Sequence, residues 1–128
     1  MNAKLLFRAS AIVEVTTGLS LLLAPLFVIG LLLGDGLAST GVAVARVLGI
    51  GLLSVGVAAW ESPGQDTRLA PRAGLCIYNL GAALLFVIVG TTGDMGGVIL
   101  WPVAALHALL GAMMLRAMLT PSRNATGG

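Results

Sequence analysis

Four strongly polar side chains stand inside otherwise apolar stretches of the chain, and their types can support chemistry: Glu14, Arg46, Asn79 and His107. A carboxylate and an imidazole can exchange a proton in the physiological pH range. A guanidinium can hold an anionic or polar head group. Ionisable residues inside a membrane segment are costly and are functional candidates by default. We predict that the four residues form a ligand- or proton-binding site, and the lack of a nucleophile favours binding over catalysis.

The composition identifies the solvent around these residues. Of 128 residues, 58% are hydrophobic and 9% are charged, with a mean hydropathy of +1.04. A soluble domain carries about 25% charged residues, so this chain cannot cover a water-facing surface and the bilayer must be its main solvent. The composition excludes a Rossmann or P-loop enzyme, a disulfide scaffold and a DNA-binding module. It predicts no nucleic-acid partner.

The apolar stretches predict four membrane-spanning helices, over residues 4–24, 40–60, 73–92 and 97–118. Each is long enough to cross about 30 Å of hydrocarbon at about 1.5 Å per residue. Polar residues are too sparse for the alternation that a barrel strand needs. We therefore expect an all-α, integral membrane four-helix bundle that forms a single domain over residues 1–119. The polar segment 120–128 is predicted to be a disordered tail.

The first apolar stretch is longer than one span, because it continues to Leu33. A proline inside a helical pattern removes a backbone donor and breaks or kinks the helix. We expect the break at Pro25. The segment from Leu26 to Leu33 is then either a kinked continuation of the span or a short apolar segment at the membrane interface.

The cations predict the orientation of the bundle. With the N-terminus inside, one side of the membrane receives most of the basic residues: Lys4, Arg8, Arg68, Arg72, Arg116 and Arg123. The two opposite loops hold only Asp35 and Asp94. Cytoplasmic loops are enriched in Lys and Arg, so we expect both termini in the cytoplasm and a multi-pass protein of the bacterial inner membrane.

The polar residues fall on seams of small side chains at helical spacing, which predicts that they face one another. The seam of the first span consists of Phe7, Ser10, Glu14, Thr17, Gly18 and Leu21. The seam of the second consists of Arg46, Gly49, Leu53, Gly56 and Trp60. The seam of the fourth consists of Ala104, His107, Gly111, Met114 and Met118. We expect Glu14, Arg46 and His107 to converge, either as a functional site or as a pairing that only fixes helix register.

The sulfur-containing side chains predict no cofactor and no metal site. Cys76 is the single cysteine, so the chain has no C-x-x-C pair for disulfide redox chemistry. A soft metal ion could find ligands in Cys76, Met113, Met114 and Met118. Met and Cys in a helical bundle usually fill packing gaps, and one histidine carries little specificity for haem.

Several marked segments resemble the small, largely uncharacterised bacterial four-helix membrane proteins of the DoxX-like type. These segments are Glu14 to Pro25, Ala45 to Leu53, Tyr78 to Leu80, and Trp101-Pro102 with His107. The resemblance covers nearly the whole chain and implies the same four-helix membrane fold. Some members are subunits of quinone-linked sulfur oxidation systems, so it also implies a redox-complex subunit as one possible role.

The segment Ala11 to Val15 resembles the first helix of the small multidrug resistance transporters, whose acidic residue exchanges protons for cationic drugs. This resemblance implies a proton role for Glu14. The third span departs from the family, because Tyr78-Asn79-Leu80-Gly81 lacks its Trp and Gly-rich motif. An arginine beside Glu14 would also neutralise a site for cations.

The sequence therefore favours an accessory or ligand-binding membrane subunit that carries a buried Glu, Arg and His cluster. The alternatives are a proton-coupled small-molecule transporter and a subunit of a quinone-linked redox complex. Four short helices leave little room for a pore within a single copy of the chain, so we expect a homo-oligomer or docking on a larger membrane complex. A small lipophilic or anionic molecule is the expected ligand.

Overall fold

A computed structural model describes residues 3–60, 69–93 and 96–120, and within them the chain is all-α. The helices are α1 (Ala3–Leu23), α2 (Pro25–Leu33), α3 (Ser39–Ala59), α4 (Leu69–Thr92) and α5 (Leu100–Leu119). The expected all-α class is confirmed, with one short helix in addition to the four long ones. The predicted disordered tail lies, except for Thr120, outside the described residues.

The four long helices are apolar enough to cross a membrane. Their apolar segments run over Lys4–Leu23, Ser39–Ala59, Ala70–Thr92 and Leu100–Leu119. Large apolar side chains such as Leu84, Val47 and Leu109 are exposed on the outside of the bundle. An outer surface of this kind suits lipid rather than water. The four apolar helices thus suggest a multi-pass membrane protein.

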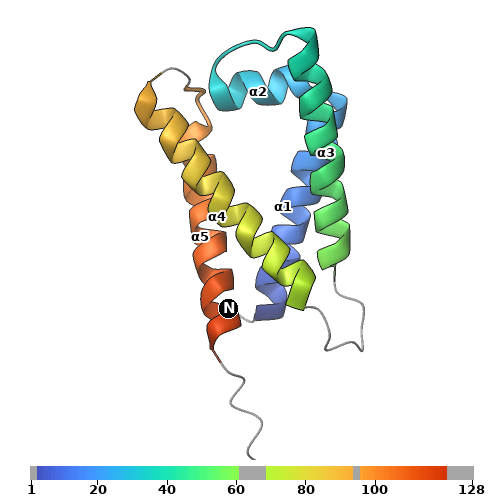
Figure 1. The fold of residues 1–128 in the computed structure, drawn as a ribbon, viewed down its shortest axis with the longest axis vertical. Coiled ribbons are helices and arrows are strands. Elements are labelled where there is room, and N and C mark those ends of the chain that lie inside the picture. Colours follow the sequence, from blue (N-terminus) through green and yellow to red (C-terminus); the bar gives the residue numbers. More distant parts are fainter. Residues whose placement is uncertain (1–2, 61–68, 94–95, 121–128) are drawn as a thin grey trace, which may run out of the picture.

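The long helices form two antiparallel pairs, α1 with α3 and α4 with α5 (Figure 1). The pairs lie close together at the end where α1 begins and α5 ends, and they diverge toward the other end. Buried side chains including Phe7, Leu75 and Met114 pack at the narrow end. There the Arg72 guanidinium lies over the Phe7 ring, 5.2 Å from its centroid. At the wide end, a cavity lies between the two pairs and is lined by residues of all five helices.

Glycines allow α1 and α3 to approach closely. A Cβ atom on Gly18 would lie 2.7 Å from the Gly49 carbonyl oxygen, and one on Gly49 would lie 2.7 Å from the Gly18 oxygen. Helices in lipid associate through such close backbone packing, because apolar side chains gain little by leaving an apolar solvent. The two glycines therefore fix the crossing that positions Glu14 and the cavity-lining part of α1.

Helix α2 crosses the wide end of the bundle (Figure 1). Chain direction changes at Ala24, which has a φ of −138°, and Pro25 begins the new helix. The predicted break is thus followed by a separate helix rather than by a kinked continuation of α1.

The final carbonyl groups of α2 accept hydrogen bonds from the segment before α5. Gly96 N–H donates to Leu33 O at 2.8 Å, Gly97 N–H to Leu32 O at 3.1 Å and Ile99 N–H to Leu31 O at 3.2 Å. A helix end leaves its last carbonyls unpaired, so these bonds both satisfy α2 and tie it to the α4–α5 pair. Position 97 must be glycine, because a Cβ atom there would collide with the α2 backbone. Helix α2 is therefore held across the space between the helix pairs.

Candidate functional site

Glu14 and Asn79 meet in a fully buried polar cluster between α1 and α4. The Asn79 amide nitrogen Nδ2 lies 3.3 Å from Glu14 Oε1, 3.1 Å from Ser10 Oγ and 2.9 Å from the Leu75 carbonyl oxygen. Ser10, Glu14 and Asn79 are each 0% exposed. The seam predicted on the first span explains this placement, since Ser10 and Glu14 occupy successive turns of one helix face. Two of the predicted site residues are thus in direct contact.

The cluster is short of a hydrogen-bond donor. Glu14 Oε2 and Asn79 Oδ1 are buried and have no hydrogen-bond partner within the part of the chain that the structure describes. The Asn79 amide has only two hydrogens for the three oxygens around it. Glu14 also makes no ion pair among the described residues. A buried polar atom without a partner is costly, so the arrangement can take up a proton or another small donor at the Glu14 carboxyl group.

His107 is held by its own helix and by two aromatic rings of α4. Its Nδ1 lies 2.9 Å from the Val103 carbonyl oxygen, one turn earlier in α5. Because a carbonyl oxygen only accepts, Nδ1 carries the hydrogen, and Nε2 of the neutral ring is then an acceptor. The rings of Tyr78 and Phe86 pack edge-on against the imidazole, with centroids 5.9 and 5.8 Å away. The imidazole is therefore fixed, with Nε2 making no hydrogen bond among the described residues.

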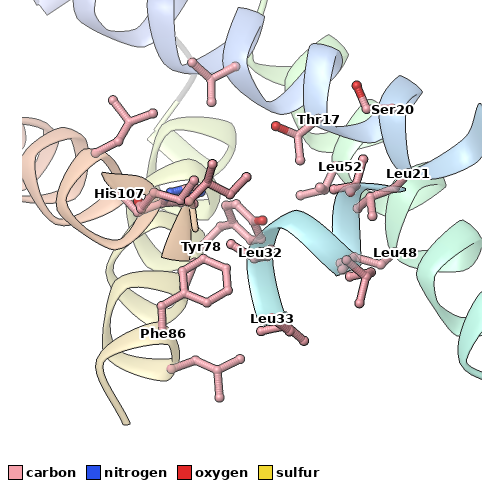
Figure 2. A pocket seen from close by; sticks show the side chains of 18 of the residues that line it. Thr17, Ser20, Leu21, Leu32, Leu33, Leu48, Leu52, Tyr78, Phe86 and His107 are labelled. Carbon is pink, nitrogen blue, oxygen red and sulfur yellow. The ribbon is translucent and has the colours of Figure 1, made fainter. Parts of the chain in front are cut away.

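A cavity of about 670 Å³ lies between the two helix pairs and beneath α2, with residues of all five helices in its walls. Figure 2 shows Tyr78, Phe86 and His107 on one side, Leu21, Leu48 and Leu52 on the other, and Leu32 and Leu33 of α2 between them. The polar groups in the walls are Thr16, Thr17, Ser20, Tyr78 and His107. No Asp, Glu, Lys or Arg lines the cavity within the described part of the chain. Its size and apolar walls are typical of a site for a small lipophilic molecule.

Tyr78 gives the cavity a polar group beside His107 that the sequence prediction missed. Its hydroxyl makes no hydrogen bond among the described residues, and its ring contacts His107. Tyrosine hydroxyl groups in apolar surroundings usually find a partner. The signal in the sequence was that Tyr78 is the single tyrosine of the chain and precedes Asn79. Ser10, the partner of Asn79, lies on the predicted seam of the first span and is a further member of the polar cluster.

The structure does not bring Arg46 to this site. Arg46 is exposed, and no interaction of its side chain is found within the described residues. The buried seam of α3 is shifted by one residue from the predicted one and consists of Ala45, Gly49, Leu52, Gly56 and Ala59. The expected convergence of Arg46 with Glu14 and His107 is therefore wrong, and so is the expected Glu14–Arg46 register pair. The small Ala45 allows close packing of α3 against α1, whereas the long side chain of Arg46 can extend along the outside toward the nearby end of α3.

The remaining site residues form two neighbouring parts that share α4. Asn79 contacts Glu14 on α1, and the adjacent Tyr78 contacts His107 on α5. Cys76 is buried one turn away, with its Sγ 3.7 Å from the Gly111 carbonyl oxygen. The described residues include no group of three or more His, Cys, Asp or Glu side chains that could hold a metal ion.

Comparisons with known proteins do not assign the chain to a family. It matches no protein-family model, no curated protein and no solved structure. The resemblances to the DoxX-like proteins and to the small multidrug resistance transporters therefore stay predictions. The functional argument rests on the geometry of the cavity and of the polar cluster.

Proposed function

We propose that this protein is a ligand-binding subunit of the bacterial inner membrane that holds a lipophilic molecule in the cavity beneath α2. The observation that carries the proposal is the combination of about 670 Å³ of apolar-walled space with the Tyr78 hydroxyl and His107 Nε2, neither of which makes a hydrogen bond among the described residues. Ligand sites are clefts or cavities of about this size with mostly apolar walls and a few polar groups. The cavity is partly open to the outside of the bundle, so a lipophilic molecule can reach it.

The walls define the chemistry of that molecule. With no charged side chain in the described lining, a charged head group would be buried without a counter-ion, which is costly. The Tyr78 hydroxyl can donate or accept, and His107 Nε2 accepts. The ligand is therefore an uncharged amphiphile, with a hydroxyl or similar donor between Tyr78 and His107 and an apolar body beneath α2.

The Glu14 cluster favours a second candidate, a proton-coupled transporter of such a molecule. Glu14 Oε2 has no hydrogen-bond partner among the described residues, while its helix neighbours Val13 and Thr17 line the cavity. Uptake of a proton at Glu14 would add the missing donor within one turn of the ligand. In this candidate, proton binding and ligand binding are coupled through α1 and α4.

The proposed setting follows from the basic residues and the apolar surface. Cytoplasmic termini agree with the excess of Lys and Arg on one side. The start of α1 and the end of α5 lie at the same end of the bundle, as this orientation requires (Figure 1). We also propose that the chain acts as a homo-oligomer or as a subunit of a larger membrane complex.

Photolabelling with an uncharged long-chain alcohol tests the binding proposal. The probe is hexadecanol carrying a diazirine, added to the purified protein in detergent, with unlabelled hexadecanol as competitor. The key variant is Gly81→Leu, which fills the cavity. Its matched control is Gly51→Leu, an exposed helical glycine that does not line the cavity. A Cβ atom at either glycine meets nothing within 4 Å, so both variants should fold.

We expect saturable labelling of the wild type that Gly81→Leu abolishes and Gly51→Leu preserves. Tyr78→Phe removes one hydrogen bond and should weaken competition by hexadecanol about fivefold to tenfold. Equal labelling of both glycine variants would contradict the cavity as the binding site. For the transport candidate, proton flux in proteoliposomes that depends on hexadecanol and is lost in Glu14→Gln supports coupling. Flux that persists in Glu14→Gln would rule it out.

A further inference from the structure

The large cavity has an opening between α3 and α4. Three apolar residues of its walls are also well exposed on the outside of the bundle: Leu48 of α3 is 46% exposed, and Ile77 and Leu85 of α4 are 71% and 56% exposed. Side chains that belong both to a cavity wall and to the outer surface lie where the wall ends. Helices α3 and α4 are close together where α3 ends and α4 begins, and they separate toward the other end (Figure 1). The opening is therefore a gap in the side of the bundle.

One edge of α4 borders this opening. Ile77, Gly81 and Leu85 follow one another at intervals of four residues, so they lie along one face over about 12 Å of the helix. Gly81 has no side chain, and a Cβ atom there would meet nothing within 4 Å, so the middle of this edge is open. On α3, Leu52 is buried, whereas Leu48, one turn nearer the start of the helix, is exposed. The α3 wall of the cavity therefore ends at Leu48.

The opening lies toward the apolar end of the proposed ligand. Tyr78 and His107 lie on one side of the cavity, and Leu48 and Leu52 lie on the other (Figure 2). A ligand whose hydroxyl group lies between Tyr78 and His107 extends its chain away from them, toward α3. The side chains at the edges of the opening are as apolar as the lipid tails outside. A hydrocarbon chain can therefore pass from the cavity into the bilayer without meeting a polar group.

The other gap between the helix pairs, between α1 and α5, is less apolar. The cavity residues exposed on that side are Thr16 of α1 and Leu106 of α5, which is 40% exposed. Ser20, one turn after Thr16, also lines the cavity, and its hydroxyl donates to the Thr16 carbonyl oxygen at 2.8 Å. Placing hydroxyl groups against hydrocarbon is unfavourable, so the gap between α3 and α4 is the better exit for an apolar chain.

We propose that the ligand is a membrane alcohol longer than the cavity, whose chain leaves between Leu48 and Leu85 and ends in the bilayer. This inference rests on the proposed ligand-binding function, and it identifies the ligand class as long-chain and isoprenoid alcohols that enter from the membrane. Hexadecanol is short enough to stay inside, whereas a longer chain continues through the opening. The length of the ligand is then not limited by the cavity volume of about 670 Å³.

Competition between two isoprenoid alcohols and the photolabel tests this proposal. The purified protein in detergent is labelled with the diazirine derivative of hexadecanol, and solanesol or geranylgeraniol is added as the competitor. The two alcohols have the same repeating unit and the same primary hydroxyl group. Solanesol has more than twice as many carbons, so the cavity can enclose geranylgeraniol but not solanesol. The comparison therefore isolates the length of the chain.

Tryptophan substitutions test the position of the opening. Leu48→Trp and Leu85→Trp add bulk at its two edges. The matched controls are Val47→Trp and Leu84→Trp, because these neighbours are 69% and 63% exposed and do not line the cavity. Leu106→Trp narrows the gap between α1 and α5 instead.

We expect the two alcohols to compete for the wild type within about threefold of each other. Leu48→Trp and Leu85→Trp should weaken competition by solanesol at least about tenfold and change competition by geranylgeraniol less than about threefold. The other three variants should match the wild type.

Three outcomes would contradict this expectation, and they are distinguishable. If geranylgeraniol competes for the wild type and solanesol does not, the ligand is enclosed, which overturns this proposal but leaves the ligand-binding function standing. If Leu106→Trp rather than Leu85→Trp loses solanesol selectively, the chain leaves on the other side and the proposal is wrong. If the hexadecanol derivative does not label the wild type saturably, the ligand-binding function itself is refuted, and this proposal with it.

Discussion

Because Asn79 and Glu14 are in contact, we expect the losses of stability caused by substitutions at these two positions not to add. Asn79→Leu removes an amide that lies within hydrogen-bonding distance of three buried oxygens. The amide has two hydrogens and can therefore make two full hydrogen bonds at a time; at about 0.6 kcal/mol each inside a membrane protein, these contribute about 1 kcal/mol. Leaving the buried acceptors without a donor adds about 1 to 3 kcal/mol. We therefore expect Asn79→Leu to lower the free energy of unfolding by about 2 to 4 kcal/mol.

The double variant Glu14→Leu with Asn79→Leu should be less destabilised than the sum of the single variants. Removing both partners leaves no carboxyl group without a donor, and such replacements are often nearly neutral. The coupling between the two positions should be at least about 1 kcal/mol, as is typical for residues in one hydrogen-bond network.

Equilibrium unfolding in mixed micelles with increasing dodecyl sulfate, followed by circular dichroism, measures these differences. Thr91→Val is the control, because the Thr91 hydroxyl is exposed and bonds only to carbonyls of its own helix. We expect it to change the free energy of unfolding by less than about 0.5 kcal/mol. If the effects of Glu14→Leu and Asn79→Leu add to within about 0.5 kcal/mol, the two side chains do not interact as the structure places them.

Three further predictions concern the framework around the cavity. Gly97→Ala should lower stability by more than about 2 kcal/mol because its Cβ atom would strike the α2 backbone, whereas Gly96→Ala, with open space around its Cβ, should have little effect in thermal unfolding. Gly18→Ala should lower the free energy of unfolding by about 1 to 3 kcal/mol because it forces α1 away from α3. Gly51→Ala should leave the free energy of unfolding unchanged in the same assay. A reporter enzyme that works only in the cytosol should be active when fused after Gly128, and activity of a periplasmic reporter there instead would reverse the proposed orientation.

Composition and hydropathy were sufficient to predict the four long helices, because a chain with 9% charged residues has few stable alternatives in lipid. The break at Pro25 followed from the missing amide hydrogen of proline. The course of α2 across the bundle could not be predicted, since it depends on hydrogen bonds with residues 96–99, more than sixty positions later. Long-range backbone pairing of this kind leaves no local pattern in the sequence.

Only part of the site could be predicted from the sequence, again because contacts between helices leave no local pattern. The seam on α1 was placed correctly, and Ser10 and Glu14 are buried on it. On α3, the predicted and the observed seams share Gly49 and Gly56, so spacing alone did not distinguish them. Arg46 lies about 10 Å from the start of α3, so its long side chain can extend toward the interface, while the small Ala45 allows close packing against α1; helical spacing contains neither of these differences.

Mapping where the diazirine of the hexadecanol probe inserts is the most direct test of the proposed cavity. With the diazirine near the far end of the chain, the account predicts crosslinks to residues of the cavity wall such as Leu32, Leu33 and Phe86. These crosslinks should disappear when Gly81→Leu fills the space. Crosslinks spread equally over lipid-facing residues such as Leu84 and Leu109, and unchanged in Gly81→Leu, would contradict a ligand site within the bundle.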